Sequence, residues 1–225
     1  MCVLEKCIAR MPNERFIYLA DSANMPYGVK TAAEIKRAAT DCVRELAAMN
    51  CKAVLVACNT ATAVAIDDVR RMYPSMTVVG LEPAVKPCLR ELGRNGYAVA
   101  LVTSATYGSD KFKRLTAACG GRIIGSEQPL LAGFIEDNAG DFDALRPFVF
   151  DMLSKYGDAE AIVLGCSHYS HVSGLIREFY GGNIKIYDGA DGAVNRLAYC
   201  LSAADIRAPE NQIGSVRFYS TYKSA

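Results

Sequence analysis

The amino-acid sequence predicts an α/β fold in which mostly parallel strands are flanked by helices. Short runs of β-branched and apolar residues recur along the whole chain, and segments with helical periodicity separate them. Polar residues do not interrupt these runs, which is typical of strands that are covered on both faces. Regular alternation of strands and helices places such strands in parallel sheets with helices on both sides.

The elements can be assigned in order from these patterns. A helical pattern at residues 3–9 opens the chain, and Pro12 and Asn13 form a turn, so we expect a crossover helix whose preceding strand is absent from this sequence. The next helix has a defined start, because Thr31 can cap it and Glu34 can reach back to the cap N–H in a capping box. Its apolar face repeats at spacings of four and three: Ile35, Ala39, Cys42, Leu46 and Met49. The expected strands are 16–19, 53–56, 77–79, 98–102, 122–124, 161–164, 184–187 and 216–219.

The composition excludes several classes of protein. The chain has 225 residues, and 25 Lys and Arg nearly balance 24 Asp and Glu, which gives no electrostatic reason to expect a nucleic-acid partner. No apolar run approaches the ~20 residues of a membrane helix, and the N-terminus does not read as a signal peptide. We therefore expect no membrane association and a cytoplasmic location. The nine cysteines include no C-x-x-C pair, so neither disulfides nor a zinc site is expected.

The two halves of the chain show a weak internal sequence similarity. Residues 53–60 and 161–168 each run an apolar strand into a cysteine, two polar residues and a helical pattern. We expect two related, pseudo-symmetric α/β lobes, the first formed by residues 1–82 and 188–225 and the second by 83–187. Ligands of such sheets bind beyond the carboxyl ends of the strands. The internal similarity therefore predicts an active site between the lobes.

Cys58 and Cys166 are the strongest candidates for chemistry. Each follows a strand and begins a helix, where free N–H groups and the helix dipole are expected to lower the thiol pKa. Two thiols on opposite faces of one carbon can remove a proton from one side and deliver a proton to the other, which inverts the carbon. His168, two residues after Cys166, can assist that thiol. The other cysteines, such as Cys42, are expected to be packing residues.

Two further loops are suited to an anionic ligand. The segment 21–28 follows the first predicted strand and contains Asp21, Ser22 and a Pro-Tyr-Gly turn. Thr103, Ser104 and Thr106 follow the strand at 98–102. Hydroxyls and free N–H groups at helix starts are suitable hydrogen-bond donors to a carboxylate.

Five motifs, taken together, resemble those of the glutamate racemases in the cofactor-independent aspartate/glutamate racemase superfamily. The resemblance covers nearly the whole chain, and the two cysteine motifs in this order and separation are its most specific part. The motifs are Asp21-Ser22-Ala23 with Pro26-Tyr27-Gly28, Ala57-Cys58-Asn59-Thr60-Ala61, Gly80-Leu81-Glu82-Pro83-Ala84, Thr103 with Thr106, and Gly165-Cys166-Ser167-His168-Tyr169.

The resemblance implies an enzyme that interconverts L- and D-glutamate without pyridoxal phosphate, metal or other cofactor, and that supplies D-glutamate for bacterial peptidoglycan. It further implies a homodimer. By motif position, Cys58 and Cys166 would be the two bases, with His168 and Glu136 assisting Cys166. The residues implied to hold the substrate are Asp21, Ser22, Tyr27, Gly28, Asn59, Thr60, Thr103, Thr106, Ser167 and His168.

The sequence also departs from the family pattern. The family begins with a strand that ends in Asp-Ser-Gly, and its Asp assists the first cysteine, but this sequence supplies neither. Ser167 replaces the usual Thr and keeps the hydroxyl. Two other functions therefore stay open: a racemase-like module that binds an amino acid or a protein without turnover, and an amide hydrolase that uses Cys166 as nucleophile and His168 as base.

Overall fold

The computed structural model describes residues 2–222 and divides into two compact units. The first unit contains the chain up to Leu81 together with the residues from Ala190 onward, and the second is Glu82–Gly189. The boundaries expected from the sequence were 82/83 and 187/188. Within the described residues, no helix has both the length and the apolar character needed to cross a membrane.

The second unit is built on one four-stranded parallel sheet with the strand order β5-β4-β6-β7. In this register Val102 pairs with Gly165 and with Glu127, so the carboxyl ends of the three strands lie at one edge. The loops that leave these strands are therefore neighbours in space. The strands are β4 (Ala98–Val102), β5 (Ile123–Glu127), β6 (Ala161–Gly165) and β7 (Lys185–Asp188).

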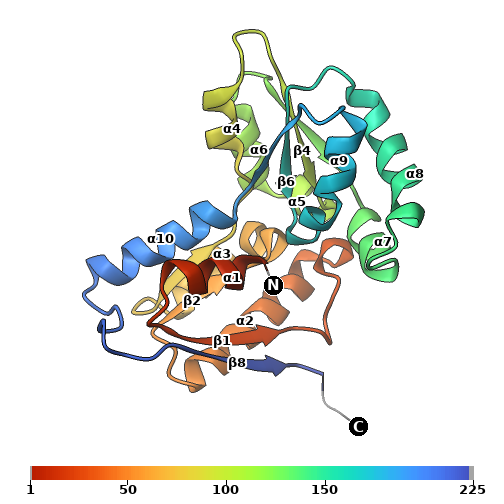
Figure 1. Cartoon of the computed structure of the whole chain (residues 1–225). Helices are drawn as coiled ribbons and strands as arrows, with labels where there is room; N and C mark the ends of the chain where they lie inside the picture. The colour runs from red at the N-terminus through yellow and green to blue at the C-terminus, as the bar shows by residue number, and fades with distance from the viewer. Residues whose placement is uncertain (1, 223–225) are drawn as a thin grey trace. The chain divides into compact units, whose positions relative to one another are not determined.

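Helices cover both faces of this sheet, as the uninterrupted apolar strands predicted (Figure 1). Val99 and Leu101 of β4 belong to a core with α7, α8 and α9, whereas Ala98 and Ala100 belong to a core with α4 and α6. Alternate side chains of one strand therefore enter two separate cores. The helical segments are α4 (Val85–Glu91), α5 (Ser104–Gly108), α6 (Asp110–Ala117), α7 (Leu131–Asp137), α8 (Phe142–Leu153) and α9 (Ser173–Phe179), with 3₁₀ turns η2 (Ser154–Tyr156) and η3 (Ser167–Val172).

The first unit contains two separate two-stranded parallel sheets. β1 (Arg15–Ala20) pairs with β8 (Ser215–Ser220), which lies beside it in Figure 1, and β2 (Ala53–Val56) pairs with β3 (Thr77–Gly80). Within residues 2–222, no strand ladder joins the two pairs. The helical segments of this unit are α1 (Cys2–Arg10), η1 (Tyr27–Val29), α2 (Ala32–Ala48), α3 (Asn59–Met72) and α10 (Ala190–Ala203).

Two hydrophobic cores stabilise the first unit. One packs α1 and α10 against Leu55, Val79 and Phe16, and the other packs α2 and α3 against Val54 and Val78. The predicted capping box of α2 is confirmed: Glu34 N–H donates to the Thr31 side chain at 3.3 Å, and Thr31 N–H donates to the Glu34 carboxylate at 2.8 Å. The predicted α/β class is therefore confirmed in both units, and the predicted opening helix is α1.

Candidate active site

Cys166 lies at the carboxyl edge of the second unit's sheet, directly after β6. It is the residue before the 3₁₀ turn η3, and only 8% of its surface is exposed. Gly165 precedes it, and a Cβ at this position would lie 2.4 Å from Val102 Cγ1 and 2.8 Å from Leu101 O. A glycine is therefore needed for β6 to approach β4 closely at the point where the chain turns to present the thiol.

His168 and Glu136 extend a chain of interactions from the Cys166 thiol. The Cys166 Sγ lies 3.6 Å from His168 Nδ1, and His168 Nε2 lies 2.6 Å from Glu136 Oε1. Glu136 comes from α7, whereas the other two residues follow β6, so packing of α7 against η3 assembles the group. Both the histidine and the glutamate side chains keep about a third of their surface exposed, at 30% and 31%.

His168 Nδ1 is the ring nitrogen that faces the thiol, and Nε2 is the one that faces Glu136. The ring nitrogens exchange donor and acceptor roles with the tautomer, and Glu136 Oε1 makes no hydrogen bond within the described residues, so the two side chains interact through charge when the imidazole is protonated. The carboxylate also stabilises the imidazolium that forms once Nδ1 is protonated. The geometry is therefore that of a thiol with its own base, as the sequence spacing of Cys166 and His168 indicated.

Thr103 and Thr106 lie at the same sheet edge, because Thr103 follows Val102, the β4 partner of Gly165. Both residues are buried, at 3% and 1% exposure. Thr103 caps α5: its hydroxyl oxygen accepts the Thr106 N–H at 3.4 Å and donates to the Thr106 hydroxyl at 3.1 Å. Ser167 is the first residue of η3 and is partly buried.

Cys58 occupies the equivalent place in the first unit, at the end of β2 and the start of α3. As the N-cap residue, its Sγ accepts the Ala61 N–H at 3.5 Å. The expectation that the helix start lowers its pKa is wrong in net direction. Burial raises the pKa of the Cys58 thiol, although the Ala61 and Thr60 N–H groups and the Thr60 hydroxyl act in the opposite direction.

Asn59 and Thr60 follow Cys58 and are both buried, each at 2% exposure. The Asn59 Nδ2 has no hydrogen-bond partner within the described residues. An unpaired buried amide donor is costly, and such a group is typical of a position that meets a ligand's acceptor.

The 21–28 loop follows β1 in the same unit. Its Asp21 carboxylate accepts hydrogen bonds from Tyr27 and Asn24 within the loop and from Thr221 beyond β8. Burial acts to raise the pKa of Asp21, but these hydrogen bonds outweigh it and hold the pKa below its usual value. The sequence analysis identified Asp21, Tyr27 and Gly28 but missed Thr221, because nothing in the local pattern links positions 200 residues apart.

Cys42, expected to be a packing residue on the apolar face of α2, is partly buried, and the charge of Asp21 acts on its thiol. Burial, and next the negative charge of Asp21, raise the pKa of Cys42 to about 12. Cys42 is therefore part of the polar cluster around the 21–28 loop.

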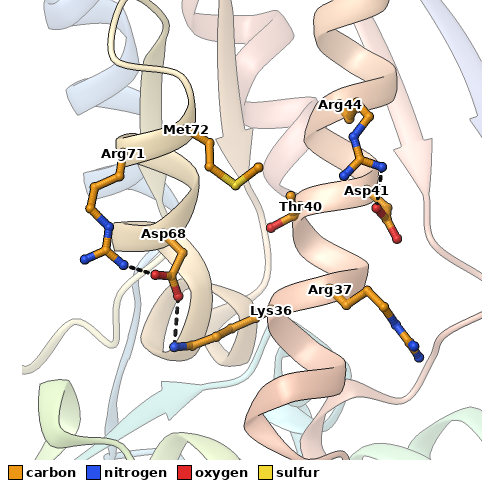
Figure 2. Close-up of a pocket in the computed structure, with 8 residues that line it drawn as sticks. All are labelled: Lys36, Arg37, Thr40, Asp41, Arg44, Asp68, Arg71 and Met72. Carbon is orange, nitrogen blue, oxygen red and sulfur yellow. Dashed lines mark hydrogen bonds and ion pairs between the residues drawn. The ribbon is translucent and has the colours of Figure 1, made fainter.

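A separate hollow of about 550 Å³ lies between α2 and α3, and none of the predicted site residues lines it (Figure 2). Its lining is charged, and four cationic side chains outnumber the two aspartates, which pair with three of them. Asp68 binds Lys36 at 2.9 Å and also binds Arg71, and Asp41 binds Arg44 at 2.7 Å. The candidate chemistry lies elsewhere, in one group of residues in each unit.

Comparison with known proteins identifies the family of the chain. The profile of the Asp/Glu/Hydantoin racemase family matches residues 2–197. The chain is 35% identical to a protein of Clostridium perfringens named glutamate racemase, over 98% of this chain and 86% of that one. It is 34% identical to a glutamate racemase of Clostridium acetobutylicum, over 98% of this chain and 87% of that protein.

Solved structures show the same fold. A glutamate racemase of Thermus thermophilus, solved in complex with β-chloro-D-alanine, superposes with a TM-score of 0.78 at 28% identity, covering 98% of this chain and 83% of that one. A glutamate racemase isoform of Bacillus anthracis superposes with a TM-score of 0.84 at 24% identity, covering 98% and 84%. With the family profile spanning most of its length, the chain belongs to the Asp/Glu/Hydantoin racemase family.

Proposed function

We propose that the protein is a glutamate racemase that interconverts L- and D-glutamate by moving the Cα proton between two thiols. The observation that carries the proposal is the Cys166–His168–Glu136 chain, with its 3.6 Å and 2.6 Å separations. The two clostridial relatives, which are both named glutamate racemase and align over most of their length, support the choice of substrate.

On one side of the substrate, Cys166 acts as base. Its S–H proton moves to His168 Nδ1, which leaves a thiolate beside an imidazolium that Glu136 stabilises. The thiolate then takes the Cα proton and becomes a thiol again, and the Cα–H electron pair stays on the substrate as a carbanion. The assisting pair gives the thiol proton an acceptor within hydrogen-bond reach.

On the other side, Cys58 acts as acid. Burial raises the pKa of this thiol, so it is protonated and ready to donate to the carbanion from the opposite face. The resulting thiolate is stabilised where it lies, because the Ala61 and Thr60 N–H groups point at its sulfur. In the reverse direction the two cysteines exchange roles, so the thiols themselves supply the acid and the base and the step requires no cofactor.

The substrate would be held by polar groups at the helix starts. The unpartnered Asn59 amide is the best-supported contact, and Thr60 and Ser167 follow the two cysteines directly. We propose the remaining contacts from Ser22, the Tyr27–Gly28 turn, Thr103 and Thr106. That the Thermus thermophilus relative binds β-chloro-D-alanine supports an amino-acid site in this fold.

The physiological setting follows from the reaction. D-glutamate is a component of peptidoglycan, so we propose a role in cell-wall formation and cell shape. We propose a cytoplasmic location, which is supported by the eight free cysteines among the described side chains. We further propose that the protein works as a homodimer.

The test is circular dichroism of glutamate during incubation with the protein, starting from each enantiomer. We expect the signal of both to decay to zero, and we expect Cys58→Ser and Cys166→Ser to abolish the decay. Cys200→Ser, a change at a partly buried cysteine on α10, serves as the matched control and should retain activity. Binding of glutamate without racemisation by the folded wild-type protein would instead identify a binding module and contradict the proposal.

A further inference from the structure

Asp21 is the centre of a hydrogen-bond cluster that holds the 21–28 loop in one conformation. Asn24 Nδ2 donates to both carboxylate oxygens, at 2.8 Å and 3.0 Å, and the Tyr27 hydroxyl donates to Oδ2. Two donor groups of the loop therefore meet at one side chain.

The third hydrogen-bond partner of Asp21 comes from the far end of the chain. The Thr221 hydroxyl donates to Asp21 Oδ1 at 2.7 Å, and its oxygen accepts the N–H of Ala23 at 3.1 Å. The parallel β1–β8 ladder continues one residue further here, since Thr221 N–H donates to Ala20 O at 3.0 Å. One hydroxyl thus connects the side chain at the start of the loop with the backbone two residues later.

These contacts argue against direct binding of substrate by Asp21. Its carboxylate already accepts hydrogen bonds from three side chains, and a negative charge placed against the carboxylates of glutamate would repel them. Ser22 and the Tyr27–Gly28 turn remain suitable for binding the substrate. The hydrogen bonds around Asp21 hold both of them in place. That turn, η1, packs against α3, the helix that Cys58 begins.

We propose that Asp21 and Thr221 form a latch that positions the 21–28 loop for substrate binding, and that both are positioning residues which do not touch the substrate. The inference rests on the proposed racemase function, but the hydrogen-bonded latch itself can be tested without turnover. It assigns a function to the segment after β8, which no motif in the sequence marks.

The first test compares Thr221→Val with Thr221→Ser. Valine keeps the shape but removes the donor to Asp21 and the acceptor for Ala23, so we expect KM for glutamate to rise about tenfold while kcat falls less than about threefold. Serine keeps the hydroxyl and should restore KM. Asp21→Asn is the second variant, with the same expected pattern. An unchanged KM in the folded Thr221→Val protein would overturn the proposal.

The second readout is hydrogen–deuterium exchange of the Ala23 amide, which donates to Thr221. We expect exchange about tenfold faster in Thr221→Val and no change in Thr116→Val, whose hydroxyl donates to carbonyls of its own helix α6 in the other unit. Unchanged exchange at Ala23 would show that no latch forms.

The two readouts separate failure of the latch from failure of the racemase assignment. If the wild-type protein does not racemise glutamate, calorimetric titration with L-glutamate replaces KM. Weaker binding by Thr221→Val than by Thr221→Ser would then support the latch, whereas equal binding, or no binding by the wild type, would overturn it.

Discussion

His168 is the residue on which the chemistry at Cys166 depends, because it lies between the thiol and Glu136. We expect His168→Gln to lower kcat about 100-fold to 1,000-fold, since an amide cannot take the thiol proton. KM should change little if the histidine acts mainly in proton transfer.

The same variant can be checked with α-deuterated glutamate. Slowing only the step at Cys166 should increase the primary isotope effect on kcat/KM for the enantiomer that Cys166 deprotonates and decrease it for the other. A purely structural defect would change both effects alike, and that result would contradict the assigned role of His168.

Asn59 provides a second residue-scale prediction. Its buried Nδ2 has no partner in the described part of the chain, and a substrate carboxylate would supply one. We expect Asn59→Ala to raise KM roughly 10-fold to 100-fold, the loss typical of one hydrogen bond to a charged group, with a smaller change in kcat. Steady-state kinetics in both directions measure this, with exposed Asn183→Ala as control. An equal fall of kcat and kcat/KM would place Asn59 at the transition state only.

At the scale of single residues, the sequence predicted which residues are site candidates better than it predicted their burial, pKa and hydrogen bonds. Cys58, Cys166 and His168 could be found because their local order is visible in the chain. The pKa of Cys58 could not, since burial by residues distant in sequence outweighs the local N–H groups. The hydrogen bond of Thr221 to Asp21 likewise depends on tertiary packing.

At the scale of elements, the capping box of α2 offers a direct test. Thr31→Ala removes the side-chain acceptor of the Glu34 N–H and should destabilise the first unit by about 1 kcal/mol. Thr31→Ser keeps the hydroxyl and should have a much smaller effect. Urea denaturation followed by far-ultraviolet circular dichroism gives the comparison, and equal midpoints for the alanine variant and the wild type would show that the cap contributes nothing.

Helices and strands were predictable because their signals are local. The apolar run at residues 98–102 predicted β4 with the observed bounds, and the cap at Thr31 fixed the start of α2. The strand expected at 122–124 instead spans Ile123–Glu127, because pairing with β4 extends it through Gly125 and Ser126, which carry no strand signal of their own. How the strands of the first unit pair could not be predicted, since two separate sheets leave no trace in periodicity.

At the scale of the whole molecule, buried thiols predict a loss of stability in alkali. Burial raises the pKa of Cys7 and of Cys88 to about 11, from 9.0 in the unfolded chain. Between pH 9 and 11 the unfolded state loses these protons first, so the folded state binds more protons and its stability falls as pH rises. For buried Cys88, a shift of two pKa units corresponds to about 3 kcal/mol.

Urea midpoints measured from pH 7.5 to 11 test this expectation. Cys88→Ala should lower the midpoint at pH 7.5 and make its decline with pH shallower. Val99→Ala, a core truncation that removes no titrating group, should lower the midpoint and keep the wild-type decline. A decline that is the same in both variants would show that the Cys88 thiol does not contribute.

The central claim is that two thiols act on opposite faces of one carbon, and the isotope content of the first product tests it most directly. L-glutamate, and separately D-glutamate, is incubated with the protein in D₂O, and the two enantiomers are separated early in the reaction. Thiol protons exchange with solvent, so the account predicts deuterium at Cα of the newly formed enantiomer and protium at Cα of the recovered substrate, from either starting enantiomer. Protium retained in the product would indicate a single base that returns the same proton, and would contradict the account.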